Sequence, residues 1–105
     1  MFAVVYRWRI KPELEAKFEE GWRLGTAAIK RDLGGWGSRL HKSADGRYFA
    51  YAQWPDEETF MRNRKERMPY SDPAARALYT EALEGSEAEL LVMGEVVSDL
   101  LDQRS

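Results

Sequence analysis

The chain contains no cysteine, a single histidine and only four prolines in 105 residues. Without cysteine it has no disulfide bonds, no thiolate nucleophile and no Cys-ligated zinc or iron–sulfur centre. No segment reaches the roughly 18 consecutive apolar residues of a membrane span. Arginines interrupt the apolar start of the chain, where a signal peptide needs a continuous run. We therefore expect a cytoplasmic protein with no membrane partner.

The chain also lacks a strong net charge. Sixteen basic and 18 acidic side chains give a formal charge of -2, so there is no global attraction for nucleic acid, and no nucleic-acid partner is expected. A hydrophobic fraction of 44% with 32% charged residues is typical of a globular domain that folds around an apolar core. Because this length supports one modest core, residues 1–105 are predicted to form a single domain.

Apolar periodicity predicts the elements of the first half. Residues 2–10 alternate between apolar and polar side chains as in a strand. Residues 12–33 repeat apolar side chains at mostly fourfold spacing behind Pro12, which favours a long amphipathic helix. Residues 36–54 predict two strands joined by the turn "ADG", in which Gly46 is free to adopt the left-handed conformation.

The second half predicts two helical segments and a last strand. Asp56 is a candidate N-cap of one helix, and Asp72 precedes Pro73 as the candidate N-cap of another that ends by Gly85. The β-branched run within residues 87–101 favours a final strand over a helix. The order β-α-β-β-α-(α)-β predicts an α+β, ferredoxin-like fold with helices on one face of an antiparallel four-stranded sheet.

The short turn sets a hairpin register in which the numbers of paired residues sum to 90. On one side Trp36 would face Trp54, and this side should lie beneath the helices together with Tyr6 and Trp8. The other side is too apolar to stay in water and too charged for a monomer core, so a homodimer is predicted to cover it. That side is expected to include Val5, Gln53, Leu91, Met93 and Val97, and its predicted dimer-interface residues are Arg7, Arg9, Arg39, His41, Phe49, Tyr51 and Glu95.

His41 is the only histidine and has a side chain suited to act as a base near neutral pH. The register places it opposite Phe49, on the predicted dimer side and away from the helices. No second histidine or carboxylate cluster accompanies it at ligand spacing, so no metal site is expected. An interface role for His41 is therefore favoured over a catalytic one.

Two segments, "VVYRWRIKPELEAKFEEGW" (4–22) and "GGWGSRLHKSADGRYFAYAQWPDEETFMRN" (34–63), resemble dimeric α+β barrel proteins of the antibiotic-biosynthesis-monooxygenase type. The resemblance lies in a strand that runs into a "KP" helix start, a hairpin that ends in Trp, and a short acidic helix opening. It implies two sheets that close into a barrel, with a substrate cavity between sheet and helices in each subunit. Some members of this family oxygenate polycyclic aromatic substrates without a cofactor or metal, some degrade haem, and many have no assigned reaction.

The haem-degrading members use an Asn on the first strand, a Trp late in the second helix and a His in the next helical segment. Here Tyr6 occupies the strand position, the Trp position falls near Asn63, and residues 72–85 contain no histidine. Without that axial ligand, haem degradation is disfavoured.

The resemblance then implies a monooxygenase for a small quinol- or anthrone-like aromatic substrate that needs no cofactor. Its candidate catalytic residues are Tyr6 and Asn63, which would hydrogen-bond the substrate. The candidate substrate-binding residues are Trp8, Trp36, Ser38, Tyr48, Ala50, Ala52, Trp54 and Tyr70.

Other interpretations stay open. Aromatic residues on a helix-covered sheet commonly form plain core, which fits a non-catalytic dimer that binds a small ligand or acts in regulation. The basic run "RNRKERMPYSDP" (62–73) could gate a pocket or be solvated surface. The element order also occurs in RNA-recognition motifs, where Phe49 and Tyr51 would stack bases. The acidic balance and the long first helix oppose that interpretation.

Overall fold

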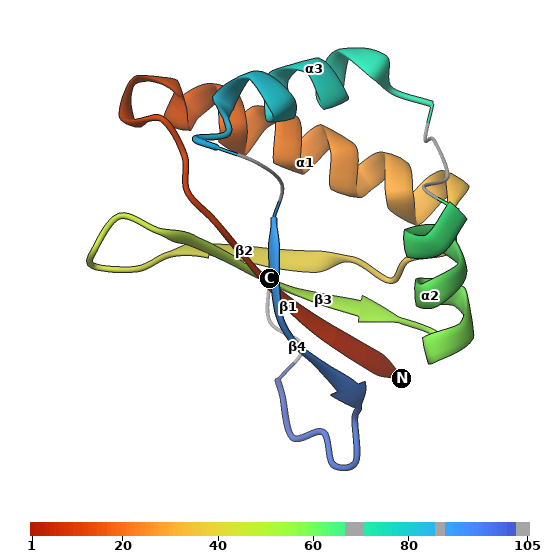
Figure 1. The fold of residues 1–105 in the computed structure, drawn as a ribbon. Coiled ribbons are helices and arrows are strands. Elements are labelled where there is room, and N and C mark those ends of the chain that lie inside the picture. The colour runs from red at the N-terminus through yellow and green to blue at the C-terminus, as the bar shows by residue number, and fades with distance from the viewer. Residues whose placement is uncertain (67–70, 86–87, 103–105) are drawn as a thin grey trace.

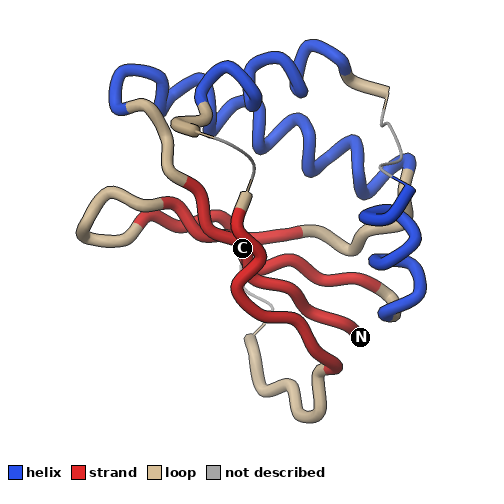
Figure 2. The backbone as a smooth tube through the Cα atoms, viewed as in Figure 1, coloured by secondary structure: helices blue, strands red, loops and turns tan. Residues whose placement is uncertain are grey.

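The computed structural model describes residues 1–66, 71–85 and 88–102 (Figure 1). Its four antiparallel strands form one sheet in the order β2-β3-β1-β4. Helices α1 and α3 lie over one face of the sheet and α2 lies at one end of it, while the described residues place no helix on the opposite face (Figures 1 and 2). The ferredoxin-like α+β prediction is confirmed. The elements are β1 (Phe2–Trp8), the 3-10 helix η1 (Pro12–Leu14), α1 (Glu15–Asp32), β2 (Ser38–Lys42), β3 (Tyr48–Trp54), α2 (Glu57–Glu66), α3 (Pro73–Ala82) and β4 (Glu89–Glu95).

The helix ends follow local sequence chemistry. The Asp56 carboxylate accepts the Thr59 backbone N–H at 2.7 Å at the start of α2, and the Asp72 carboxylate accepts the Ala75 N–H at 2.9 Å at the start of α3. Both predicted N-caps are therefore confirmed. Part of the predicted basic loop is helical, since α2 continues to Glu66. None of the helices in the described ranges has the length and apolarity needed to cross a membrane.

The core consists of two aromatic clusters. In one, Phe18 of α1 packs against Tyr48 of β3 with ring centroids 5.1 Å apart. In the other, Phe2 of β1 packs against Phe60 of α2 at 5.7 Å. The half-buried side chain of Tyr6 contacts both clusters. The space between the clusters therefore lies above the middle of β1.

The hairpin register is confirmed from the Ser38–Ala52 pair to the Lys42–Tyr48 pair, but the predicted Trp36–Trp54 pair is wrong. The backbone N–H of Trp36 donates to the Gln53 carbonyl at 2.9 Å, and the Gln53 N–H donates to the Gly37 carbonyl at 2.8 Å. Two consecutive residues thus share Gln53 as partner, which is the pattern of a bulge. Gly37 has a φ of 105°, which favours glycine there, and the bulge moves Trp36 to an exposed position.

A second irregularity reverses the predicted alternation of β4. Val5 pairs with Val92 but Tyr6 pairs with Leu90, so Leu91 is an extra residue in the strand. Because paired residues share a face, Glu95 comes to the helix side opposite Phe2. The predictions that Glu95 and Met93 lie on the open face in simple alternation are therefore wrong, while Leu91 has no paired residue that would assign its face. Met93 pairs with Val4 on the helix side, and Val97 lies beyond β4 with its side chain 96% exposed.

The opposite face of the sheet, here named the open face, carries the remaining predicted interface residues. Val5, Arg7, Phe49 and Tyr51 are half-buried within the single chain. The His41 ring stacks on Phe49 with centroids 5.6 Å apart and planes 9° apart. The Arg7 guanidinium pairs with the Glu89 carboxylate at 2.6 Å. Arg9 and Arg39 are exposed, and the homodimer stays a prediction.

Candidate active site

A cavity of about 480 Å³, here named the inner cavity, lies between the sheet and the three helices. Its volume falls within the ~300–1,000 Å³ of small-molecule sites. Its walls take residues from both core clusters, so it occupies the space that the clusters leave between them. The sheet contributes Tyr6, Trp8, Ala50, Ala52 and Trp54, and the helices contribute Trp22, Thr26, Ile29, Phe60, Asn63, Arg64, Arg76 and Tyr79 among others.

Small residues create this space. Ala50 and Ala52 face the helices from the centre of β3, where larger side chains would fill the gap. On the helix side, Gly21 lets α1 and α3 approach closely, because a Cβ atom at this glycine would lie only 2.6 Å from the backbone nitrogen of Tyr79. The two helices thus form a closely packed roof over the cavity.

Tyr6 presents a neutral hydroxyl to the cavity. Burial raises the pKa of its phenol, while the charge of Arg64 and a hydrogen bond from its guanidinium act in the opposite direction. Because the net effect is a raised pKa, the phenol keeps its proton at neutral pH. Tyr6 is therefore a hydrogen-bond donor rather than a base.

Asn63 has an unsatisfied acceptor. Its side-chain Nδ2 donates to the Thr59 carbonyl at 2.8 Å and to the Leu33 carbonyl at 3.2 Å. Since both partners are acceptors, the amide orientation follows from the contacts. The Oδ1 atom is then buried without a partner among the described residues. A buried acceptor of this kind costs free energy unless a ligand or water supplies a donor.

A polar contact ties β1 to α3 across the cavity wall. The Trp8 indole Nε1–H donates to the Tyr79 hydroxyl at 2.5 Å, and the two rings meet edge to face with centroids 6.3 Å apart. This contact satisfies the indole N–H of a tryptophan that is 6% exposed. The Trp8 ring is consequently held in one orientation as a flat part of the wall.

The charged residues that the structure describes in the lining of the inner cavity are all cationic. Lys30, Arg64 and Arg76 line it, and no Asp or Glu among the described residues does so. All three side chains are exposed, so they lie at the rim. Within residues 1–66, 71–85 and 88–102, no ion pair joins any of them to a carboxylate.

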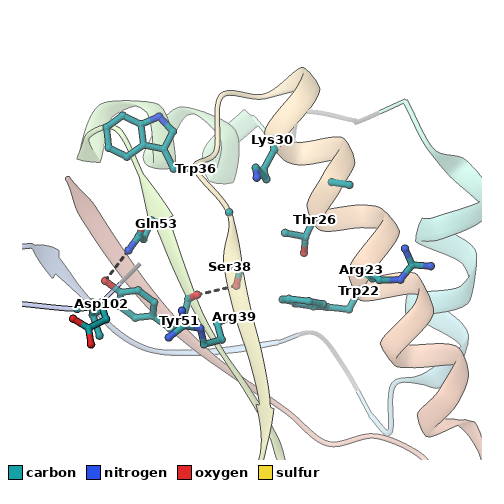
Figure 3. Close-up of a pocket in the computed structure, with 13 residues that line it drawn as sticks. Trp22, Arg23, Thr26, Lys30, Trp36, Ser38, Arg39, Tyr51, Gln53 and Asp102 are labelled. Atoms are coloured by element: carbon teal, nitrogen blue, oxygen red, sulfur yellow. Dashed lines mark hydrogen bonds between the residues drawn. The ribbon is translucent and has the colours of Figure 1, made fainter. Parts of the chain in front are cut away.

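A second space of about 410 Å³, here named the outer pocket, opens between α1 and the hairpin (Figure 3). Trp22, Thr26 and Lys30 reach it from α1, and Ser38 and Gln53 reach it from β2 and β3. The Ser38 hydroxyl donates to the Tyr51 carbonyl at 2.9 Å. The inner cavity and the outer pocket are adjacent because both are lined by Trp22, Thr26, Lys30, Gly37, Ser38 and Gln53.

Most residues expected at the site line the inner cavity, but two described ones do not. Tyr48 belongs to the core, where its hydroxyl donates to the Glu19 carboxylate at 2.7 Å, so its assignment to substrate binding is wrong. Trp36 lines only the outer pocket, because the bulge turns it away from Trp54. Tyr70 lies outside the described residues. The expected residues that do line the inner cavity are Tyr6, Trp8, Ser38, Ala50, Ala52, Trp54 and Asn63.

Several lining residues were missed in the sequence. The sequence predicts Trp22 only as an apolar residue of the long helix. It predicts Arg64 only as a member of the basic run, with no indication that Arg64 contacts Tyr6. Arg76 and Tyr79 come from α3, whose position over α1 depends on the close approach at Gly21. Within the described ranges, His, Cys, Asp and Glu side chains form no group of three able to hold a metal ion.

The antiparallel ferredoxin-like sheet carries a cavity beneath its helices whose volume is that of a small-molecule site, within an α+β fold. Neither family models nor curated proteins gave a match at the level of sequence. Solved structures do match over nearly the whole chain.

SnoaB, a cofactor-independent oxygenase from Streptomyces nogalater, has 19% identity and a TM-score of 0.65, over 96% of this chain and 97% of its own. A "putative antibiotic biosynthesis monooxygenase" from Bordetella bronchiseptica has 19% identity and a TM-score of 0.67, over 92% and 97%. Rv0793 from Mycobacterium tuberculosis has 15% identity and a TM-score of 0.65, over 95% and 98%. The chain therefore has the fold of the antibiotic-biosynthesis-monooxygenase-type proteins, as its sequence segments indicated.

Proposed function

We propose that the protein is a cofactor-independent monooxygenase that oxidises a small quinol- or anthrone-like aromatic substrate in the inner cavity. The observation that carries the proposal is the buried Asn63 Oδ1, which lacks a partner among the described residues and belongs to a side chain that lines the same cavity as the neutral Tyr6. One group accepts a hydrogen bond and the other donates one, which suits a substrate with phenol and carbonyl groups. The shared fold with a cofactor-independent oxygenase supports the same reaction class.

The cavity walls favour a flat aromatic molecule. Trp8, Trp22 and Trp54 offer extended apolar surfaces, while Ala50 and Ala52 leave space above the sheet. Burial of aromatic surface supplies most of the affinity in such a site, and a few polar groups fix the orientation. A phenolic hydroxyl of the substrate would donate to Asn63 Oδ1, and its ketone oxygen would accept from Tyr6.

The first chemical step is loss of a proton from the activated carbon of the substrate. The negative charge that forms is delocalised onto the ketone oxygen as an enolate. The Tyr6 hydroxyl and the positive charge of Arg64 stabilise that oxygen, so the proton leaves to water at a lower pH than in free solution. This step needs no side chain to act as the proton acceptor.

The second step uses the enolate as the electron source. Its carbon bonds to O₂ and gives a peroxide anion, which takes up a proton. Cleavage of the O–O bond with loss of the second C–H proton yields a ketone and water. The net change is CH₂ + O₂ → C=O + H₂O, in which the substrate supplies all four electrons.

Oxygen consumption with 1,8-dihydroxyanthrone tests the proposal, with quinone formation measured in parallel and the reaction without protein subtracted. We expect one quinone for each O₂ consumed. Tyr6→Phe should lower kcat/KM about a hundred- to a thousandfold, because one oxyanion donor is lost. Tyr48→Phe is the matched control, since it removes the same atom from a tyrosine outside the cavity. Equal rates in the two variants would contradict the assignment of Tyr6.

Absence of turnover with a panel of anthrones and quinols would refute the enzyme. If such compounds still bound, the protein would be a non-catalytic ligand-binding dimer instead. The dimer itself is part of the proposal, since the half-buried apolar side chains of the open face, Val5 and Phe49 among them, favour a second copy of the sheet as their cover.

A further inference from the structure

The rim of the inner cavity carries one sign of charge. Lys30, Arg64 and Arg76 line the cavity, while the chain as a whole has a net charge of -2. With 18 acidic residues in the sequence, the lack of a described carboxylate in this lining concentrates positive potential at the entrance. A ligand that enters the cavity therefore passes close to cations that form no ion pair with any carboxylate in the described part of the chain.

Lys30 has a position that the other two cations do not share. It alone among the described cationic residues lines both the inner cavity and the outer pocket. Its side chain lies against Gly37, where a Cβ atom would lie 3.5 Å from its Cδ and 3.8 Å from its Nζ. The ammonium group therefore lies at the junction of the two spaces, beside the backbone of the bulge.

Two further cations line the outer pocket with Lys30. Arg23 holds both oxygens of the Glu20 carboxylate at 2.7 Å, and the exposed Arg39 of β2 does not line the inner cavity. Asp102 is the one carboxylate among its described lining residues. Figure 3 shows Lys30 on the α1 side of the pocket and Asp102 on the opposite side, beside Tyr51.

We propose that the preferred substrate is an aromatic compound with an anionic substituent, such as a ring carboxylate, and that Lys30 selects it by binding that group at the junction. This inference rests on the proposed function, because it assumes that the aromatic rings occupy the inner cavity. The anionic group then projects toward the outer pocket. Arg64, which hydrogen-bonds to Tyr6, then remains free of the anionic substituent and can stabilise the enolate oxygen of the substrate.

A purely structural role for Lys30 makes a different prediction. Lys30 is in the last turn of α1, where a cation interacts favourably with the helix dipole. If that were its only role, removal of the charge would lower stability and leave ligand preference unchanged. Selectivity between a charged and a neutral ligand is therefore the informative measurement.

The experiment compares two ligands that differ only in one carboxylate, 1,8-dihydroxyanthraquinone and its 3-carboxylic acid. Both are already oxidised, so calorimetry measures binding without turnover. We expect the carboxylate to bind wild type about fivefold more tightly, which corresponds to about 1 kcal/mol at 25 °C for a solvent-exposed pair. This preference should decrease as the salt concentration rises.

In Lys30→Met the preference should disappear while the neutral ligand keeps its affinity, and Lys30→Arg should retain the preference. Lys17→Met is the matched control, because it changes the net charge equally on the same helix without lining either space. Binding of both ligands with equal affinity to wild type, or an unchanged preference in Lys30→Met, would overturn the inference and leave the proposed function standing. Failure of both ligands to bind would refute the aromatic site itself, and the inference with it.

Discussion

The close approach of α1 and α3 makes Gly21→Ala a sharp test of how the cavity roof is built. The added methyl carbon would lie 2.6 Å from the Tyr79 backbone nitrogen and 3.0 Å from both the Ala75 carbonyl oxygen and the Leu78 Cβ. Ordinary contacts are about 3.5–4.0 Å, so the helices must separate by roughly 1 Å. Two of the three contacts are with backbone atoms, which no rotamer change can remove.

Two effects of opposite sign determine how much Gly21→Ala changes the free energy of unfolding. Overpacking costs about 1–3 kcal/mol, and replacing glycine by alanine inside a helix returns up to about 1 kcal/mol. Because the clash is with backbone, we expect a net loss of about 1–2 kcal/mol in the free energy of unfolding. For a domain of this size that corresponds to a decrease of about 5–15 °C in Tm.

Urea and thermal unfolding at one fixed protein concentration measure this loss, since association of subunits makes Tm depend on concentration. Ala27→Gly on the exposed side of α1 measures the difference in helix propensity between alanine and glycine alone. It should lower the free energy of unfolding by up to about 1 kcal/mol. If Gly21→Ala were as stable as wild type or more stable, the helices would not be in the contact described. The account of the cavity roof would then be refuted.

Two further predictions concern α2 and the open face. Hydrogen bonding to the Thr59 backbone lowers the pKa of Asp56, so its stabilising contribution is complete above the unfolded pKa and is lost as the pH falls through the lower folded value. Asp56→Asn keeps the cap without the charge and should show a smaller loss of stability between pH 6 and pH 3 in urea titrations; an unchanged loss would contradict the assignment. Val5→Asp should convert a dimer into a folded monomer in light scattering, whereas Ala74→Asp on the exposed start of α3 should not. A wild-type monomer would refute the dimer.

Regular alternation explains what the sequence could predict. The apolar side of residues 2–8 has to be buried, and Phe2, Val4 and Trp8 are indeed 6% exposed or less. The "ADG" turn then fixes the hairpin register, and the aspartate caps fix the helix starts, because each depends only on neighbours in the chain. The candidate catalytic positions Tyr6 and Asn63 followed from the family resemblance, and both line the cavity.

Bulges and helix placement explain what the sequence did not predict. An extra residue at Leu91 reverses the alternation of β4, and no change in composition marks it. The bulge at Gly37 likewise moves Trp36 out of the expected pair. The cationic rim draws Lys30, Arg64 and Arg76 from three different helices, so it exists only once those helices are assembled on the sheet.

Gly37 also links two properties that an ordinary strand residue would leave independent. Any side chain at this position would strain the backbone at a φ of 105°, and its Cβ atom would come into van der Waals contact with the stem of Lys30. The passage between the two spaces and the placement of the cation beside it are thus encoded by the same residue. A substitution at Gly37 that alters the bulge would, for that reason, also shift Lys30 and with it the preference for ligand charge.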